Sequence, residues 1–175
     1  MARGTLFLIV GPSGSGKDTL IDGVRQTLAK THLFPRRAIT RPRDAGSEDH
    51  VAKTPAEFEA CEQTGNFALS WRAHGLAYGV PAAIETDLAR GKHVVVNGSR
   101  GIVEEARAKF APLKVIEVTA PASTLRQRLL ARGREQATEI DERVARQSSV
   151  RADVVVVNDG TVEQGVAALL AALRG

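Results

Sequence analysis

The chain has 175 residues, of which 43% are hydrophobic and 25% charged, a composition typical of one soluble globular domain with its own core. Its 24 basic residues outnumber its 20 acidic ones, but only 4% of the chain is aromatic, so an anionic small molecule explains the charge better than nucleic acid. No apolar run approaches the ~20 residues that span a membrane, no signal-peptide pattern opens the chain, and the single Cys61 excludes an internal disulfide, so we expect a cytoplasmic protein without a membrane anchor.

The first predicted element is a buried strand over residues 5–10, which leads directly into a glycine-rich loop and a helix. Gly11, Gly16 and Lys17 have the spacing of the phosphate-binding P-loop, GxxxxGK followed by Ser or Thr. Glycines let successive N–H groups face one anion, and the lysine adds a positive charge beside the phosphates. The alternative is a glycine-rich turn without a ligand, but strand, lysine and helix together favour a nucleoside triphosphate. The nucleotide-binding residues that the motif predicts are Gly11, Pro12, Ser13, Gly14, Ser15, Gly16, Lys17, Asp18 and Thr19.

Asp18 departs from the motif, which has Ser or Thr at this position to place a hydroxyl on Mg²⁺. A carboxylate is also a hard oxygen ligand for Mg²⁺, directly or through a coordinated water. Asp18 is therefore the predicted metal-binding residue, and Thr19 is the alternative ligand. A second interpretation is that Asp18 is only a favourable acid in the first turn of a helix.

The remaining elements alternate between helix and strand. Helical spacing or capping signals predict helices over residues 17–30, 54–65, 81–90, 102–110, 121–132 and 138–149, and a last helix that begins after Thr161. Short apolar runs predict strands over residues 36–40, 67–71, 93–96, 113–118 and 153–157. Apolar strands that alternate with helices predict an α/β fold with a largely parallel sheet covered on both faces.

Several polar residues outside the P-loop are candidate ligands for phosphate. Arg41 precedes Pro42, so it lies in an extended segment from which a guanidinium can bind phosphate bidentately. Asn97 and Arg100 follow a predicted strand at the carboxyl edge of the sheet, where open α/β sheets bind ligands, although an ordinary turn is the alternative. Tyr78 offers a hydroxyl donor or is a satisfied core tyrosine.

The other basic candidates have weaker support from the residues alone. Arg126, Arg128, Arg132 and Arg134 crowd the end of one predicted helix, and such a run is usually a solvated face. We expect Arg126 and Arg128 to stay on the surface. Among the histidines, His32 and His93 are expected at the surface or at strand edges, and His74 lies in a predicted loop that could approach a sugar.

The layout resembles the nucleoside monophosphate kinase group, and most nearly guanylate kinase. The matching segments are Thr40-Arg-Pro-Arg43, Tyr78-Gly79, Arg132-Gly-Arg134 with Arg143, and Val157-Asn-Asp159. Two positions depart from guanylate kinases: Leu69 stands where they carry the glutamate that recognises guanine, and Asp49-His50 stands where they carry an Asp-Tyr pair that holds the acceptor phosphate. A site without that glutamate leaves the N–H groups of guanine unpaired, so guanylate kinase activity is not expected.

A narrower family, the ribose 1,5-bisphosphate phosphokinases of bacterial phosphonate degradation, is similar in more segments. These are Gly16-Lys-Asp18, Thr40-Arg-Pro42, Ala45-Gly-Ser-Glu-Asp-His50, Phe67-Ala-Leu-Ser-Trp71, Tyr78-Gly-Val80 and Val96-Asn-Gly-Ser-Arg100. The resemblance implies a P-loop kinase fold in which a five-stranded, mostly parallel sheet carries helices on both faces, a small acceptor-binding insertion and an arginine-rich lid. It also implies transfer of a phosphoryl group from ATP, with Mg²⁺, to ribose 1,5-bisphosphate, giving 5-phosphoribosyl 1-diphosphate.

The resemblance assigns roles to individual residues. Lys17, Arg132 and Arg143 are implied to be catalytic, the two arginines as parts of a lid that closes over ATP, and Asn158 is implied to lie near the adenine. The implied acceptor-binding residues are Arg41, Arg43, His50, Tyr78, Asn97 and Arg100. An acceptor phosphate has a second pKa near ~6, so it is already an anionic nucleophile and needs no catalytic base.

We therefore expect one domain over residues 1–175, with its core in 1–35 and 91–175, an acceptor-binding region at about 36–80 and a lid at about 132–146. The expected partner is a small sugar phosphate, with neither nucleic acid nor membrane, and the sequence is compatible with a homodimer. Two alternatives stay open. One is another nucleoside monophosphate or small-molecule kinase of the same fold, and the other is a non-catalytic guanylate kinase-like binding module.

Overall fold

The computed structural model describes residues 2–44, 48–133 and 150–175. Its centre is a five-stranded sheet in the order β2-β7-β1-β8-β9, and every neighbouring pair of strands is parallel. The strands are β1 (Leu6–Val10), β2 (His32–Leu33), β7 (His93–Asn97), β8 (Leu113–Thr119) and β9 (Val154–Val157). The prediction of an α/β fold with a five-stranded parallel sheet is confirmed.

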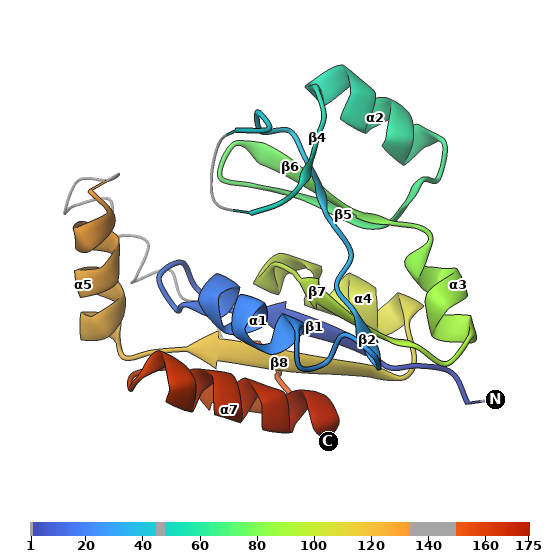
Figure 1. The fold of residues 1–175 in the computed structure, drawn as a ribbon. Coiled ribbons are helices and arrows are strands. Elements are labelled where there is room, and N and C mark those ends of the chain that lie inside the picture. Colours follow the sequence, from blue (N-terminus) through green and yellow to red (C-terminus); the bar gives the residue numbers. More distant parts are fainter. Residues whose placement is uncertain (1, 45–47, 134–149) are drawn as a thin grey trace.

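Helices cover both faces of this sheet (Figure 1). Alternate residues of β1 point to opposite sides: Phe7 and Ile9 pack with helices α1 (Lys17–Arg25) and α7 (Val162–Arg174), while Leu6 and Leu8 pack with α3 (Ile84–Ala89) and α4 (Val103–Lys109). All five residues of β1 are buried, as expected for the central strand of a sheet covered on both sides.

A second sheet of four short strands stands above one end of the first (Figure 1). Its order is β4-β3-β6-β5, with β3 (Ala38–Ile39), β4 (Val51–Ala52), β5 (Phe67–Ala73) and β6 (Leu76–Pro81). Helix α2 (Pro55–Gln63) covers it through Phe58, whose ring lies 4.8 Å from that of Phe67. The capping box predicted at Thr54 is present, and so is the one at Thr161 that opens α7.

The structure differs from the sequence-based expectation at several elements. Strands β2, β4 and β6 were not predicted, because two of them have only two residues and β6 follows β5 through a tight turn, where His74 and Gly75 both have positive φ. Helix α1 ends at Arg25 rather than near residue 30. His32, expected at the surface or at a strand edge, begins the edge strand β2, but it is buried and its Nε2 approaches the carbonyl of Leu173 at 3.0 Å.

The helix predicted over residues 138–149 and most of the predicted lid lie outside the described residues. Helix α5 (Ala122–Arg132) precedes that segment, and the short helix η1 (Arg100–Ile102) leads into α4. No helix among the described residues is long and apolar enough to cross a membrane.

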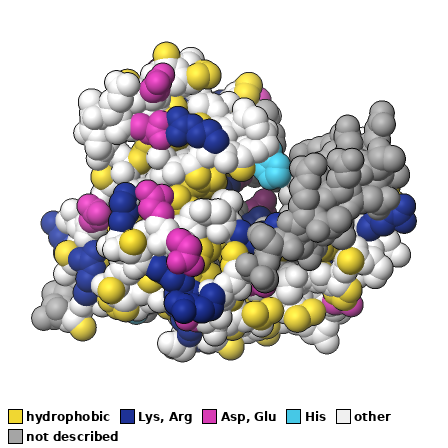
Figure 2. Space-filling model, turned by 180° about the vertical axis from the view of Figure 1, so that it is seen from behind, with side chains coloured by type: hydrophobic (Ala, Val, Ile, Leu, Met, Phe, Trp, Pro, Cys, Tyr) yellow, Lys and Arg dark blue, Asp and Glu magenta, His cyan; other side chains and the backbone are white. Residues whose placement is uncertain are grey.

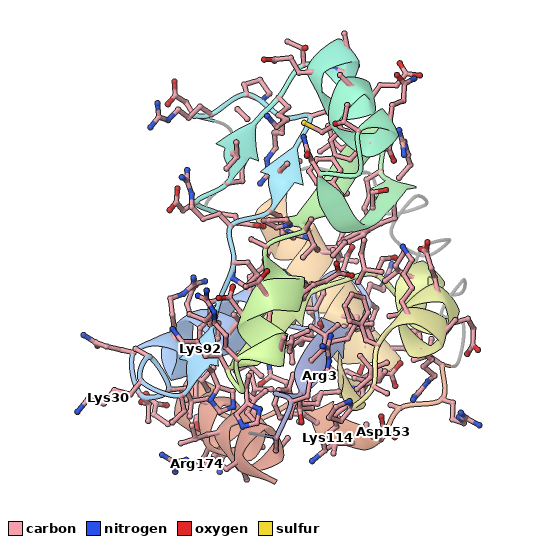
Figure 3. The ribbon with its side chains drawn as sticks, turned by 90° about the vertical axis from the view of Figure 1, so that its right-hand side faces the viewer. Arg3, Lys30, Lys92, Lys114, Asp153 and Arg174 are labelled. Carbon is pink, nitrogen blue, oxygen red and sulfur yellow. The ribbon has the colours of Figure 1, made fainter. Side chains whose placement is uncertain are left out.

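The two edges of the parallel sheet differ in character. The carboxyl ends of β1 and β7 carry the P-loop and Asn97. The opposite edge carries basic residues that precede or begin strands, namely Arg3, Lys30, Lys92 and Lys114, with Arg174 at the end of α7 (Figure 3). The candidate site therefore lies at the carboxyl edge, below the four-stranded sheet.

Candidate active site

The P-loop connects β1 to α1, and its glycines are required by close contacts. A Cβ atom on Gly11 would lie 2.0 Å from the carbonyl oxygen of Val118, and one on Gly16 would lie 2.4 Å from Nδ2 of Asn158. Gly14 and Gly16 have φ of 85° and 86°, in the left-handed region that favours glycine. The hydroxyl Oγ of Ser15 is buried and has no hydrogen-bond partner within the described part of the chain. An unpaired buried donor beside glycine backbone fits a loop that binds a phosphate.

Arg128 and Asn158 hold the outer side of this loop. Arg128 Nη1 donates to the carbonyl oxygens of Gly14 at 3.0 Å and Ser15 at 3.3 Å, and its Nη2 donates to the carbonyl of Asn158 at 2.7 Å. Asn158 Nδ2 donates to the carbonyl of Ser15 at 2.8 Å. These donors bind the carbonyls of Gly14 and Ser15 and so stabilise the conformation of the loop.

The expectation that Arg128 stays on the surface is wrong. Its guanidinium is half-buried and contacts residues more than 110 positions away in sequence. No local pattern distinguishes it from the exposed Arg126 on the same helix, so the sequence alone does not identify it. Asn158 was expected near an adenine, and the structure shows it buried against the backbone of the P-loop.

Helix α1 begins with three candidate residues. Lys17 is half-buried, and Asp18 and Thr19 are exposed. Asp18 Oδ1 accepts a hydrogen bond of 2.5 Å from Nδ2 of Asn97, the last residue of β7. The predicted metal-binding residue and a predicted substrate-binding residue are therefore direct partners, although 79 positions separate them. Carboxylate and hydroxyl oxygens at the start of this helix suit Mg²⁺.

Two of the predicted acceptor ligands meet at the base of the four-stranded sheet. Arg41 is half-buried, and its Nε is buried without a hydrogen-bond partner among the described residues. His50 is buried, and its Nδ1 and Nε2 each lie 3.0 Å from a backbone carbonyl, those of Glu48 and Arg41. In this conformation the ring of His50 lies against the loop that carries Arg41, and its role as a phosphate ligand stays a prediction.

The other acceptor candidates are more accessible. Tyr78 is half-buried and stacks on Trp71, with ring centroids 5.6 Å apart and planes 10° from parallel. Arg43 is exposed, and the half-buried Arg100 begins η1, where the hydroxyl of Ser99 accepts from the N–H of Gly101. Arg132 ends α5, and Arg143 lies outside the described residues, so the role of the two lid arginines stays a prediction.

A pocket of about 320 Å³ lies between α1, the segment 34–37 and the end of β7. Its arginines are paired with acids: Arg25 with Asp22 at 3.1 Å, Arg36 with Asp49 at 3.1 Å, and Arg37 with Glu48. The pocket reaches Asp18, so it adjoins the start of α1. The lining residues are Asp18, Ile21, Asp22, Arg25, Phe34, Pro35, Arg36, Arg37, Glu48, Asp49, Val95 and Asn97. The molecular surface is also hollowed between the two sheets when it is seen from behind (Figure 2).

Arg37 was not singled out from the sequence, yet it joins several of these groups. Its Nε donates to Glu48 Oε2 at 2.9 Å, its Nη1 donates to the carbonyl of Asn97 at 3.0 Å, and its guanidinium carbon lies 4.9 Å from the ring centroid of Tyr78. No group of three or more metal-ligating side chains occurs among the described residues.

Comparison with known proteins agrees with this architecture. A family model described as an AAA domain matches residues 8–149. A protein of Pseudomonas paraeruginosa named ribose 1,5-bisphosphate phosphokinase PhnN is 44% identical over 178 residues, which cover 98% of this chain and 96% of the relative. A protein of the same name from Chromobacterium violaceum is 46% identical, covering 98% of this chain and 95% of the relative. The chain belongs to the ribose 1,5-bisphosphate phosphokinase family.

Other members of this phosphokinase family are longer. A bifunctional ribose 1,5-bisphosphokinase-thymidine phosphorylase of Cupriavidus pinatubonensis is 48% identical, and the chain spans only 29% of its length. Among solved structures, guanylate kinase from Anaplasma phagocytophilum superimposes with a TM-score of 0.67 at 20% identity, over 99% of this chain and 86% of that one. The structural likeness shows the guanylate kinase-like fold.

Leu69, the residue expected in place of the guanine-recognising glutamate of guanylate kinases, lies in the hydrophobic core. Its side chain is 1% exposed and packs in the hydrophobic core with Val80 and Ile84. A carboxylate at this position would be buried among aliphatic side chains, where an ionised group is strongly disfavoured. The side chain at residue 69 therefore packs in the core and does not line the pocket beside α1.

Proposed function

We propose that this chain transfers the γ-phosphoryl group of ATP to the 1-phosphate of ribose 1,5-bisphosphate, giving 5-phosphoribosyl 1-diphosphate and ADP. The observation that carries the proposal is the combination of a glycine-restricted P-loop bearing Lys17 with Arg41, whose buried Nε has no hydrogen-bond partner among the described residues. The first feature suits a nucleoside triphosphate, and the second suits a phosphate-bearing acceptor. Relatives that match this chain over nearly their whole length carry the corresponding name.

The P-loop and Lys17 bind the donor phosphates in this proposal. Loop N–H groups and the Ser15 hydroxyl donate to phosphate oxygens, and the Lys17 ammonium offsets their charge. Mg²⁺ at this site would supply positive charge that offsets the negative charge developing on transfer. Asp18 and Thr19 are the residues that would hold it, and Asn97 keeps the Asp18 carboxylate in place through its 2.5 Å hydrogen bond.

The acceptor phosphate is the nucleophile. One of its oxygens forms the new bond to the γ-phosphorus while the bond from that phosphorus to the β–γ bridging oxygen breaks, and the electron pair leaves with ADP. The second pKa of a phosphate monoester is near ~6, so the attacking oxygen carries no proton that a base must remove. The protein contributes alignment and positive charge, which are the main requirements of phosphoryl transfer.

We assign the acceptor phosphates to Arg41, Arg43, Arg100 and Tyr78, with Asn97 at the junction with the donor site. Arg41 carries a buried Nε without a partner in the described residues, which suits a guanidinium that binds an anion. Arg132 and Arg143 are proposed to complete the charge around ATP from a lid at about 132–146. The core is proposed to comprise 1–35 and 91–175, and the acceptor-binding region about 36–80.

Initial rates with ATP and Mg²⁺ test this function across three acceptors: ribose 1,5-bisphosphate, GMP and free ribose. We expect ribose 1,5-bisphosphate to react far faster than the other two. Lys17→Ala should abolish the reaction while the thermal unfolding temperature stays close to that of the parent. Faster reaction with GMP, or turnover by Lys17→Ala within about tenfold of the parent, corresponding to about 1.4 kcal/mol of lost stabilisation, would contradict the assignment.

A further inference from the structure

Arg37 makes more directed contacts than the neighbouring arginines of the pocket. Its guanidinium binds both carboxylate oxygens of Glu48, donates to the carbonyl of Asn97 at 3.0 Å, and lies over the ring of Tyr78. Its side chain is only 11% exposed, whereas that of Arg36 is 50% exposed. A bidentate, largely buried guanidinium holds a fixed geometry, unlike an exposed ion pair.

These contacts join two separate parts of the molecule. Glu48 and Tyr78 belong to the polypeptide of the four-stranded sheet, and Tyr78 stacks in turn on Trp71 of β5. Asn97 ends β7 of the five-stranded sheet and donates to Asp18 at the start of α1. A continuous chain of contacts therefore runs from Trp71 through Tyr78, Arg37 and Asn97 to Asp18.

We propose that Arg37 is a positioning residue that fixes the acceptor-binding sheet relative to the start of α1, so that the acceptor phosphate is in line with the γ-phosphate. This proposal rests on the proposed function for its kinetic consequence. Arg37 itself touches no reacting atom. It acts through the carbonyl of Asn97, whose side chain orients Asp18, and through the ring of Tyr78.

The chain contains a matched control for Arg37. Arg72 also binds the two oxygens of a glutamate, Glu62, and also lies over an aromatic ring, that of Phe58, at 5.2 Å. All three of these residues belong to the acceptor-binding part, and neither these hydrogen bonds nor this ring contact reaches the five-stranded sheet. Loss of Arg72, whose side chain is more exposed than that of Arg37, removes a bidentate ion pair and a ring contact without removing the link to Asn97.

Steady-state kinetics of Arg37→Gln and Arg72→Gln test the kinetic part of the proposal. Since a misplacement of about 1 Å can lower the rate of transfer roughly 100-fold, we expect kcat of Arg37→Gln to fall by about 30- to 100-fold. The KM for ATP should change by less than about threefold, because the P-loop is held by other residues. Arg37→Lys keeps the charge but not all the contacts of the guanidinium, so its kcat should lie between those of the parent and Arg37→Gln. Adding Glu48→Gln to Arg37→Gln should lower kcat no further.

Fluorescence of Trp71 gives a measurement that does not depend on the acceptor. Trp71 is the single tryptophan of the chain, and it stacks on Tyr78, whose ring also contacts Arg37. We expect ATP with Mg²⁺ to change its emission in the parent and in Arg72→Gln, but not in Arg37→Gln. Thermal unfolding of each variant reports whether the fold is retained.

The two measurements separate the failure of each proposal. If the parent does not phosphorylate ribose 1,5-bisphosphate but only Arg37→Gln loses the fluorescence response, the proposed function is wrong and the positioning role stands. If Arg37→Gln matches Arg72→Gln in both kcat and fluorescence, the positioning role is wrong. A fall in kcat, in ATP affinity and in the unfolding temperature together in Arg37→Gln would also overturn the positioning role, since that pattern indicates general damage to the fold.

Discussion

Replacing Arg128 with glutamine should weaken ATP binding, although Arg128 lies behind the P-loop and does not face the phosphates. The guanidinium donates to three carbonyl oxygens, those of Gly14, Ser15 and Asn158, at distances of 2.7 to 3.3 Å. Without it, the carbonyls of these three buried residues lose a charged donor, and the loop is no longer held in the conformation that presents its N–H groups.

The size of the effect follows from the number and strength of these bonds. A hydrogen bond to a charged group contributes about 1.5–3 kcal/mol. The three bonds share one side chain and are not additive, so we expect their loss to weaken nucleotide binding by about 2–3 kcal/mol in total. At about 1.4 kcal/mol for each tenfold change, the KM for ATP or the Kd for ADP should rise by about 30- to 150-fold.

Arg126→Gln is the control for Arg128→Gln, because Arg126 is an exposed arginine on the same helix. Titration of ADP into each variant measures the nucleotide affinity directly, and steady-state kinetics give the KM for ATP. Arg128→Lys should recover part of the affinity, since an ammonium keeps the charge but cannot reach all three carbonyls. Equal nucleotide affinity in Arg128→Gln and Arg126→Gln would refute the role of Arg128 in holding the loop.

Two further predictions concern a metal and a buried histidine. If Asp18 binds Mg²⁺ or its water shell, Asp18→Asn should raise the Mg²⁺ concentration needed for half-maximal rate. Asp18→Ser should bring this concentration part of the way back to that of the parent. An unchanged Mg²⁺ dependence in both variants would mean that Asp18 is only an acid in the first turn of the helix. Burial lowers the pKa of His32 below 6.5, and the positive charges of His93 and Arg174 lower it further, whereas its bond to the carbonyl of Leu173 raises it. Because the pKa is lower in the folded protein, the unfolded chain binds more protons at acidic pH. The free energy of unfolding should therefore fall as the pH drops below about 6.5. The thermal unfolding temperature should fall more steeply between pH 7.5 and 5.5 for the parent than for His32→Gln. Equal slopes for the two proteins would contradict this assignment.

The features that the sequence predicted correctly are those fixed by neighbouring residues. The P-loop glycines, the capping boxes at Thr54 and Thr161, and the apolar run of β1 each depend on residues within a few positions of one another. Local chemistry decides such features, so spacing and residue type were sufficient to place them.

The features that the sequence did not predict depend on distant partners. Arg128 meets the carbonyl of Gly14 across 114 positions, Arg37 meets that of Asn97 across 60, and His32 approaches that of Leu173 across 141. A backbone carbonyl is present at every position, so the sequence contains no pattern that identifies it as a partner. His50 is a further example, since its ring nitrogens lie 3.0 Å from the carbonyls of Glu48 and Arg41, which no sequence pattern identified as its neighbours.

Competition between two acceptors in one reaction tests the central claim most directly. Ribose 1,5-bisphosphate and GMP at equal concentration are incubated with ATP, Mg²⁺ and the protein, and phosphorus NMR follows both acceptors at once. We predict that the resonance of the 1-phosphate is replaced by two coupled diphosphate resonances as ADP appears, while GMP stays unchanged. Consumption of GMP with ribose 1,5-bisphosphate left intact would contradict the account.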